Sequence, residues 1–225
     1  MVNSRAHDGS AHARLSIGAV LLAAGAGSRL GGRPKSLLEL DGVPLIRRQL
    51  TALAGAGVNE VVVVLGHYAD AIESVVSDYS VKRVRNLSPD DGQPSSLRIG
   101  LQALEGKLDA LIIALADQPM IDADDIAVLI DAFTSRRANG NCHMVVPRIA
   151  GEPGNPVIID AAVKDEWLQG DINAAGRHWR ESNPERVHWF DTNNNNYRVD
   201  IDTPQDIERF AAKTSHSLRW PDQPV

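Results

Sequence analysis

The sequence predicts an α/β fold: a single domain with a mainly parallel, mixed sheet and helices on both faces. Three short runs, Ile17–Ala23, Glu60–Leu65 and Ala110–Leu115, are almost continuously apolar, which is typical of strands buried on both faces. Segments with helical spacing separate these runs, and strand–helix–strand units form parallel sheets with right-handed crossovers. The length of 225 residues suits one domain of this class.

In the first half of the chain, apolar periodicity predicts alternating strands and helices. Gly55 and Gly57 suit the C-cap of the first helix, and Ser95 or Ser96 is available to cap the third. The expected elements are a strand over Ile17–Ala23, a helix over Leu45–Ala54, a strand over Glu60–Leu65, a helix from Ala69 to about Ser77, a weaker strand over Val81–Arg85 and a helix over Ser96–Ala103.

The second half continues this pattern. Thr203, Pro204 and Asp206 predict the start of the last helix, with a threonine cap, proline at the first helical position and an acidic residue in the first turn. We expect residues 1–14 to form a flexible arm, residues 15–213 the domain and residues 214–225 a tail. The other expected elements are a strand over Ala110–Leu115, a helix that opens with Asp122, Asp124 and Asp125, and strands over His143–Pro147 and Pro156–Ile159.

Composition and charge argue against several classes of protein. A formal net charge of -6 argues against a general nucleic-acid binder, which normally presents a basic face. The single cysteine, Cys142, excludes an intramolecular disulfide and a cysteine-based metal site. No apolar run approaches the roughly 20 residues of a membrane span, and the N-terminus lacks a secretory signal pattern. We therefore expect a cytoplasmic protein without nucleic-acid or membrane partners.

A glycine-rich, basic loop follows the first strand. Glycine lets backbone N–H groups converge on an anion, and an acidic protein needs local positive charge where it binds a triphosphate. The loop departs from the dinucleotide fingerprint at Leu30 and from the P-loop at Arg33-Pro34. It predicts a phosphate-binding loop, with an ordinary glycine-rich connection as the alternative. Its glycines and cations are Gly25, Gly27, Gly31, Gly32, Arg29, Arg33 and Lys35.

Three segments are expected to meet at one edge of the sheet. The glycine loop, Gly66-His67 and Asp117-Gln118-Pro119 each follow the carboxyl end of a buried strand, and ligands of open parallel sheets bind outside these ends. The pattern Leu-Ala-Ala-Gly-x-Gly-x-Arg-x-Gly, followed by Lys35, resembles the signature of nucleotidyltransferases. These enzymes move a nucleoside monophosphate from a triphosphate to an acceptor.

Nucleotidyl transfer depends on positioning and on neutralisation of phosphate charge. We expect Arg29 and Lys35 to cradle the triphosphate, with Lys35 stabilising charge that develops at the α-phosphate. Mg²⁺ is the usual further neutraliser, held by one or two carboxylates. Asp117 is the leading metal ligand and, with Arg29 and Lys35, a catalytic candidate. Alternation places Asp200 and Asp202 on the same face of a strand, so either can supply a second ligand; the alternative for Asp202 is support of the last helix cap.

Polar residues also precede the third helix. The amide of Gln93 and the hydroxyls of Ser95 and Ser96 can hydrogen-bond the edge of a base, and helix N-termini favour anions. We therefore expect these residues to form a nucleotide site together with the glycine loop. The expected nucleotide-binding residues are Leu22, Ala23, Ala24, Gly25, Gly27, Arg29, Lys35, Gln93, Ser95 and Ser96.

Several motifs in order make the resemblance more specific. They are Leu22–Gly25 with Lys35–Leu38, Ser95–Leu101, Asp117–Pro119, Gly151–Val157 and Asp200–Pro204. With them the chain resembles the molybdopterin nucleotidyltransferases, particularly the molybdenum cofactor cytidylyltransferases. The resemblance implies a nucleotide-diphospho-sugar-transferase-like, Rossmann-type fold, CTP and Mg²⁺ as ligands, and molybdopterin as the acceptor, with release of pyrophosphate. A client molybdoenzyme or its chaperone is a further partner to expect.

The departures from the family pattern lie mostly on the acceptor side. Asn155 stands where the family usually has histidine, Gln93-Pro94 replaces Met-Ser, and a Gly-Asp-x-Gly-Ala-Arg segment is matched only loosely at residues 170–177. The Ala23-Ala24 pair is the form associated with the cytidylyl branch. Two alternatives stay open: transfer to a sugar phosphate or another small phosphorylated metabolite, and a non-catalytic module that binds a nucleotide and delivers a cofactor.

Overall fold

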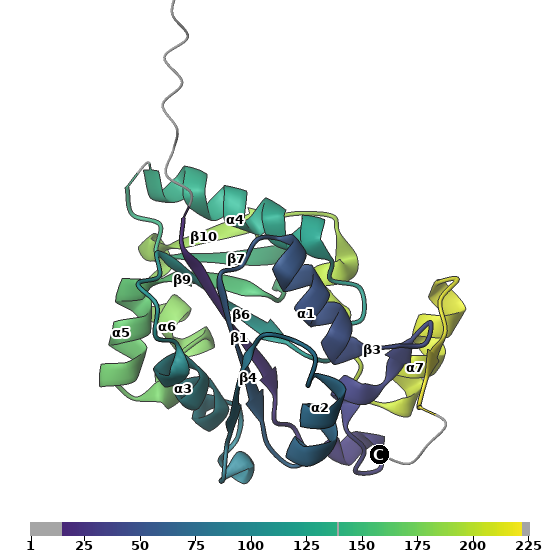
Figure 1. The fold of residues 1–225 in the computed structure, drawn as a ribbon. Helices are drawn as coiled ribbons and strands as arrows, with labels where there is room; N and C mark the ends of the chain where they lie inside the picture. The colour runs from purple at the N-terminus through teal and green to yellow at the C-terminus, as the bar shows by residue number, and fades with distance from the viewer. Residues whose placement is uncertain (1–14, 139, 222–225) are drawn as a thin grey trace, which may run out of the picture.

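A mixed sheet forms the centre of the molecule (Figure 1). The structure is a computed structural model that describes residues 15–138 and 140–221, so the predicted arm of residues 1–14 lies outside the described residues. The sheet has the strand order β10-β7-β9-β6-β1-β4-β5, with β8 paired to β7. Its strands are β1 (Ile17–Ala23), β4 (Glu60–Leu65), β5 (Lys82–Arg85), β6 (Ala110–Leu115), β7 (Met144–Ile149), β8 (Glu152–Pro153), β9 (Val157–Asp160) and β10 (Val187–Asp191).

The direction of the strands determines where a ligand site can form. β9 runs antiparallel to both of its neighbours, β6 and β7, whereas β1, β4, β5 and β6 are parallel, as are β7 and β10. The carboxyl ends of all strands along this order except β9 therefore lie at one edge. The predicted mainly parallel, mixed sheet is confirmed, and its site edge extends from β5 to β10.

Helices cover both faces of the sheet because successive side chains of its central strand point to opposite sides. Ala19 and Leu21 of β1 pack in one core cluster with helices α1, α2 and α4, whereas Val20 and Leu22 pack in a second cluster with α3, α5 and α6. Figure 1 shows this layered arrangement. The helices are α1 (Leu45–Gly55), α2 (Ala69–Val75), α3 (Gln93–Ala103), α4 (Ala123–Ala138), α5 (Ala161–Gln169) and α6 (Arg177–Ser182).

A second, smaller sheet packs with α7 (Pro204–Lys213) beside the main sheet (Figure 1). It has the antiparallel order β11-β2-β3, and Leu40, Phe210 and Leu218 share a third core cluster with Leu30 of the glycine loop. Its strands are β2 (Glu39–Leu40), β3 (Val43–Pro44) and β11 (Leu218–Arg219). Short 3-10 helices complete the described structure: η1 (Ser28–Leu30), η2 (Lys35–Leu37), η3 (Pro89–Asp91), η4 (Ile172–Ala174), η5 (Pro184–Arg186) and η6 (Asn195–Arg198).

Most element boundaries agree with the predictions, and one helix start does not. β1, β4 and β6 occupy the predicted residues, and Thr203 and Asp206 form the predicted capping box. However, α3 begins at Gln93, after Gly92 in a positive-φ conformation, without a side-chain cap. The predicted serine cap is therefore wrong, since Ser95 and Ser96 lie inside the helix.

Two further segments differ from the expectations. Asp200–Asp202 is not a strand but an extended connection between η6 and α7. The predicted tail from residue 214 is in part a strand, because Leu218–Arg219 pairs with β2 as β11 and Leu218 is buried. Among the described residues, no helix is both long and apolar enough to cross a membrane.

Candidate functional site

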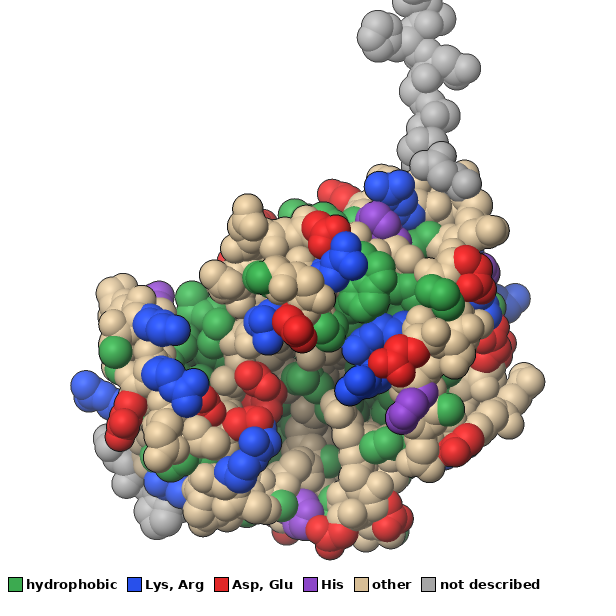
Figure 2. Space-filling view, turned by 180° about the vertical axis from the view of Figure 1, so that it is seen from behind, with side chains coloured by type: hydrophobic (Ala, Val, Ile, Leu, Met, Phe, Trp, Pro, Cys, Tyr) green, Lys and Arg blue, Asp and Glu red, His purple; other side chains and the backbone are tan. Residues whose placement is uncertain are grey.

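A cavity of about 360 Å³ lies at the carboxyl ends of β1 and β6. Figure 2 shows this side of the molecule as hollowed, with acidic and basic side chains both bordering the hollow. The cavity combines the glycine loop, the start of α3, the end of β6 and the connection before α7. Its lining residues are Leu22, Ala23, Ala24, Gly25, Lys35, Ser36, Pro89, Gly92, Gln93, Ser96, Leu115, Ala116, Asp117, Asp200 and Asp202.

The glycine loop has a fixed shape and leaves free space beside its backbone. Gly27 has φ +60°, and a Cβ there would lie 1.9 Å from the carbonyl oxygen of Arg33, so only glycine fits. The Gly27 carbonyl accepts hydrogen bonds from the backbone N–H groups of Leu30 (2.8 Å) and Gly32 (3.1 Å). Gly25 lines the cavity, and a Cβ there would meet no atom within 4 Å. Glycine at this position therefore keeps space for a ligand.

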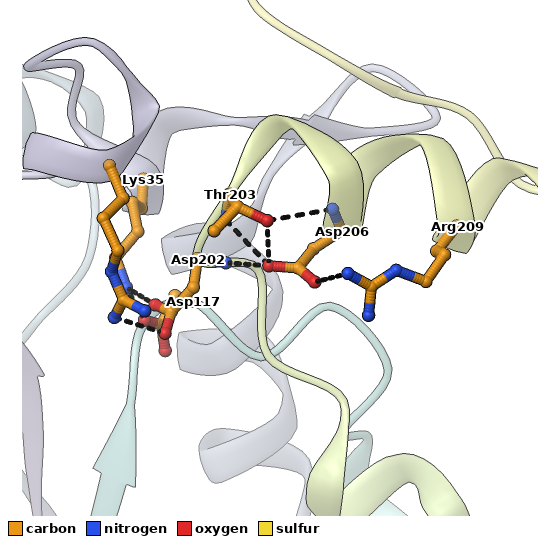
Figure 3. A network of polar contacts seen from close by, with 7 residues as sticks. Lys35, Asp117, Asp202, Thr203, Asp206 and Arg209 are labelled. Carbon is orange, nitrogen blue, oxygen red and sulfur yellow. Dashed lines mark hydrogen bonds and ion pairs between the residues drawn. The ribbon is translucent and has the colours of Figure 1, made fainter.

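Lys35 lies between two carboxylates at the floor of the cavity (Figure 3). Its Nζ donates hydrogen bonds to Asp117 and, at 2.6 Å, to Asp202. Burial lowers the pKa of Lys35, but the charges and hydrogen bonds of Asp117 and Asp202 outweigh this and raise it. The ammonium group is therefore charged at neutral pH. Arg29 donates from outside the lining to the other Asp202 oxygen at 2.6 Å.

The three predicted carboxylates line this cavity, and one of them has a buried oxygen without a partner. Oδ1 of Asp117 is buried without a hydrogen-bond partner. Removal from water and the neighbouring charges of Asp202 and Asp117 raise the pKa of Asp200, because ionisation there adds a further negative charge. Within the described residues, no three His, Cys, Asp or Glu side chains are already arranged as a complete metal site. Mg²⁺ needs only one or two carboxylates when substrate oxygens and water supply the remainder.

A buried amide holds the acidic segments together. Gln118, only 1% exposed, donates from Nε2 to the carbonyl oxygens of Asn155 and Tyr197, both at 3.2 Å. The backbone carbonyl oxygen of Gln118 accepts a 2.7 Å hydrogen bond from the side-chain amide of Gln49 of α1. The backbone N–H of Ile201 also donates to the carbonyl of Asp117. Sequence reasoning placed Gln118 in a motif but gave it no role, since its partners are backbone atoms distant in sequence.

The opposite wall of the cavity is formed by η3 and the first turn of α3. Gln93 and the buried Ser96 line it. Asn86 donates to the hydroxyl oxygens of Ser95 (2.8 Å) and Ser96 (3.0 Å). Ser95 in turn donates to the carbonyl of Gly92 at 2.9 Å. Ser95 thus stabilises the loop from outside the lining.

The structure brings together most of the predicted site residues. Lining residues that the predictions did not single out for the site are Ser36, Pro89, Gly92, Leu115 and Ala116, which are neighbours of predicted residues. Gly27, Arg29 and Ser95 lie outside the lining. The predicted residues that line the cavity are Leu22, Ala23, Ala24, Gly25, Lys35, Gln93, Ser96, Asp117, Asp200 and Asp202.

The C-terminal segment contacts the outer side of the glycine loop. The guanidinium carbon of Arg33 lies 4.0 Å from the centroid of the Trp220 ring, a cation–π contact. Asp41, which follows β2, accepts hydrogen bonds from Ser217 N (2.9 Å) and pairs with His216 Nδ1 (2.5 Å). The segment expected to be a tail therefore supports the loop that carries Lys35.

An α/β fold with a mixed sheet, a cationic glycine loop and converging carboxylates defines a nucleotide-binding transferase domain. The chain belongs to the family of the MobA-like NTP transferase domain, which matches residues 19–187. This confirms the resemblance at the level of the MobA-like nucleotidyltransferase family. The solved structures with similar folds include nucleotidyltransferases, and the domain is an enzyme of the nucleotidyltransferase class.

One relative matches most of this chain over nearly its own full length. Nicotine blue oxidoreductase of Paenarthrobacter nicotinovorans is 30% identical over 196 residues, which are 85% of this chain and 94% of that protein. The chain also matches longer proteins: it spans 26% of the bifunctional protein GlmU of Sorangium cellulosum, at 33% identity over 121 residues, or 51% of this chain.

Two solved structures superpose on most of the chain. The Rv0371c protein of Mycobacterium tuberculosis has a TM-score of 0.72 and 24% identity, covering 88% of this chain and 98% of that one. A nucleotidyl transferase from the methanogen Methanothermobacter has a TM-score of 0.66 and 29% identity, covering 88% and 97%. These likenesses confirm the predicted nucleotide-diphospho-sugar-transferase-like fold.

Proposed function

We propose that the protein transfers CMP from CTP to the phosphate of molybdopterin and releases pyrophosphate. The observation that supports it best is Lys35, held between Asp117 and Asp202 in a cavity that the open backbone at Gly25 also lines. A fixed cation beside a ligand-sized space is what a nucleoside triphosphate requires. We further propose that the protein acts in the cytosol and that a client molybdoenzyme or its chaperone is its protein partner.

The chemistry is a displacement at the α-phosphorus of CTP. An oxygen of the acceptor phosphate forms the new P–O bond, and the bond to the β-phosphate oxygen breaks, so pyrophosphate leaves with its electron pair. Lys35 stabilises the charge that develops on the α-phosphate oxygens. Its two carboxylate partners fix the ammonium group before the substrate arrives, which reduces the reorganisation needed during the reaction.

Asp117 and Asp200 are the residues that we propose to hold Mg²⁺, with Asp202 orienting Lys35 and Arg29. The unpartnered Asp117 Oδ1 and the raised pKa of Asp200 support this, because a divalent cation would satisfy the first and favour ionisation of the second. When bound, the ion neutralises phosphate charge. A structure of the M. tuberculosis relative is described as a complex with manganese, which supports a divalent-metal requirement.

Two features support CTP as the nucleotide. They are the Ala23-Ala24 pair and the polar wall at Gln93 and Ser96. A 2-C-methyl-D-erythritol 4-phosphate cytidylyltransferase of Leptospira interrogans is 30% identical over 120 residues, about half of each chain. A synthetase of the same fold, 18% identical, is described as complexed with CTP. Both lend support to the cytidylyl branch while having different acceptors in their names.

Pyrophosphate release tests the proposal. The protein is incubated with Mg²⁺ and each nucleoside triphosphate, with and without molybdopterin. The expected result is release with CTP only when molybdopterin is present, together with a cytosine dinucleotide product. Pyrophosphate release with a sugar phosphate instead of molybdopterin would identify sugar phosphates as the acceptor class. CTP binding without release from any mixture would favour a nucleotide-binding module.

The relative named an oxidoreductase supports a second candidate, a redox reaction at the same cavity. A nicotinamide dinucleotide also contains phosphates that the glycine loop could bind. Oxidation of NADH or NADPH in the presence of nicotine blue, the compound in the name of that relative, measures this activity directly. We expect no such oxidation. If it occurs and depends on the cavity residues, the proposed function becomes hydride transfer instead of nucleotidyl transfer.

A further inference from the structure

Arg180 of α6 is a half-buried cation that forms no direct ion pair among the described residues, and its acidic neighbour Glu181 is paired with Arg177. Burial lowers the pKa of its guanidinium. For the other arginines with a shifted pKa, a hydrogen-bonded carboxylate raises it; these are Arg47, Arg85, Arg148, Arg177 and Arg186. At Arg180, the charge of Glu181 offsets the effect of burial only in part. A partly desolvated charge without a directly paired counterion is costly in a folded protein, so an anion or another polar ligand would be favourable there.

Arg180 shares an aromatic ring with a second arginine. Its guanidinium carbon lies 5.7 Å from the centroid of Trp189, and that of Arg148 lies 5.2 Å from the same centroid. Arg148 is neutralised by Asp191 through two hydrogen bonds of 2.6 and 2.7 Å. The cluster of Arg148, Arg180, Trp189 and Asp191, here called the Trp189 cluster, therefore has one positive charge that no member of the cluster neutralises.

The Trp189 cluster lies at the same edge and on the same face of the sheet as the nucleotide cavity. Arg148 and Asp191 lie at the carboxyl ends of β7 and β10, which run parallel to each other and in the same direction as β6. Trp189 packs against the core cluster that contains Leu22 and Ala24 of the cavity lining.

The separation suits one substrate that spans both places. Along the order β6-β9-β7-β10, neighbouring strands are about 4.8 Å apart, so β7 lies roughly 10 Å and β10 roughly 14 Å from β6. Asp117 follows β6, so an acceptor whose phosphate lies near Asp117 and Lys35 reaches the Trp189 cluster if its body is about this long. The strand between β6 and β7 is β9, which begins after Asn155-Pro156. At Asn155 this chain departs from the family pattern.

We propose that Arg180 and Trp189 form the subsite for the end of the acceptor remote from its reacting phosphate. The chemistry of the subsite selects a flat heterocycle with oxygen or anionic substituents: the guanidinium donates to the oxygens and its plane stacks with the ring. This inference rests on the proposed function, because it concerns the acceptor of that reaction. It adds residues that the sequence motifs leave unassigned.

Binding of 6-carboxypterin, a fluorescent anionic heterocycle, tests the subsite without any transfer reaction. Its dissociation constant is measured by fluorescence titration on the whole protein, with CTP and Mg²⁺ present. Loss of a charge-assisted hydrogen bond predicts that Arg180→Gln weakens binding about 10-fold to 100-fold. The matched control is Arg177→Gln on the same helix, whose side chain is exposed and paired with Glu181; it should bind like the wild type.

Further measurements keep the outcomes separate. CTP affinity should be unchanged in Arg180→Gln, and the KM for molybdopterin should rise while the KM for CTP does not. Equal 6-carboxypterin binding by wild type and Arg180→Gln, or no binding by the wild type, would overturn the subsite. Arg180-dependent pterin binding without CMP transfer would retain the subsite and reject the proposed function. If Arg180→Gln does not fold, Arg180→Lys, which keeps the charge but loses the planar fork, provides the same comparison.

Discussion

At the scale of single residues, Lys35 connects the glycine loop to the acidic side of the cavity. Its ammonium group is held by Asp117 and Asp202, and both sides of this contact line the space for a ligand (Figure 3). We predict that Lys35→Ala lowers kcat about 100-fold, by analogy with removal of one preorganised donor, and weakens CTP binding much less. Steady-state kinetics and CTP titration separate the two effects. The exposed Lys107→Ala is the control, and a loss confined to CTP affinity would make Lys35 a binding residue only.

Asp117 is the residue on which the metal proposal depends most. We predict that Asp117→Asn, which keeps the shape of the side chain, abolishes Mg²⁺-dependent turnover. The substitution removes the negative charge of the carboxylate, whose Oδ2 contacts Lys35 and whose buried Oδ1 has no partner. The fold should persist, as judged by circular dichroism. Asp122→Asn, in the loop before α4, is the matched control. Turnover at the wild-type rate in Asp117→Asn would remove Asp117 from the metal site.

At the scale of elements, Gln118 joins the end of β6 to the loop before β9 and to η6. Gln118→Leu removes the donor to the carbonyls of Asn155 and Tyr197, and an unpaired buried polar group costs about 1–3 kcal/mol. We predict a decrease of this size in the free energy of unfolding, measured by urea denaturation, and a higher Mg²⁺ concentration for half-maximal activity. The exposed Gln205→Leu should change neither. An unaltered Mg²⁺ dependence would limit Gln118 to stability.

The stabilisation that the contact between α5 and the segment around α6 supplies is expected to depend on pH. Glu166 accepts hydrogen bonds from Arg186 (2.7 and 3.0 Å) and from Trp179 Nε1 (2.9 Å). The hydrogen bond with Arg186 is the largest cause that lowers the pKa of Glu166 below its ordinary 4.5. A lowered folded-state pKa stabilises the protein above the unfolded pKa, and this stability is lost as the pH falls through the folded value.

We therefore predict that Glu166→Gln destabilises the protein at pH 7 by about 0.2–1 kcal/mol, the range for partly exposed ion pairs. The difference from wild type should shrink below about pH 4.5. Thermal denaturation at several pH values measures it. Glu208→Gln, at a position without an ion pair among the described residues, should show no such trend. A constant difference across the pH range would show that shape, not charge, matters at Glu166.

At the scale of the whole molecule, the sequence predicts the sheet well because its central strands are short, buried and apolar throughout. Ile17–Ala23 and Ala110–Leu115 form strands at the expected residues. The start of α3 was not predictable from the serines, since Gly92 with its positive φ allows the helix to begin at Gln93. The role of residues 214–221 was missed because β11 depends on pairing with β2, a contact distant in sequence.

The residues of the candidate site that belong to recognisable sequence motifs were predictable. Lys35, Asp117 and Asp202 meet as expected. Asp117 follows a predicted strand, Asp202 precedes a predicted helix, and Lys35 belongs to the glycine-loop motif. The supports around them were not predictable: Gln118 acts through backbone carbonyls, and Trp220 through a ring placed by β11. Such partners are chosen by tertiary packing, and a single sequence does not encode them as a local pattern.

The destination of the α-phosphate tests the central claim most directly. CTP labelled at the α-phosphorus is incubated with the protein, Mg²⁺ and molybdopterin, and the products are separated. We predict that the label appears in a product that also contains the pterin, with one unlabelled pyrophosphate released for each transfer, and that Asp117→Asn forms none. Label that stays in CTP, or that appears only as free CMP, would contradict nucleotidyl transfer to this acceptor.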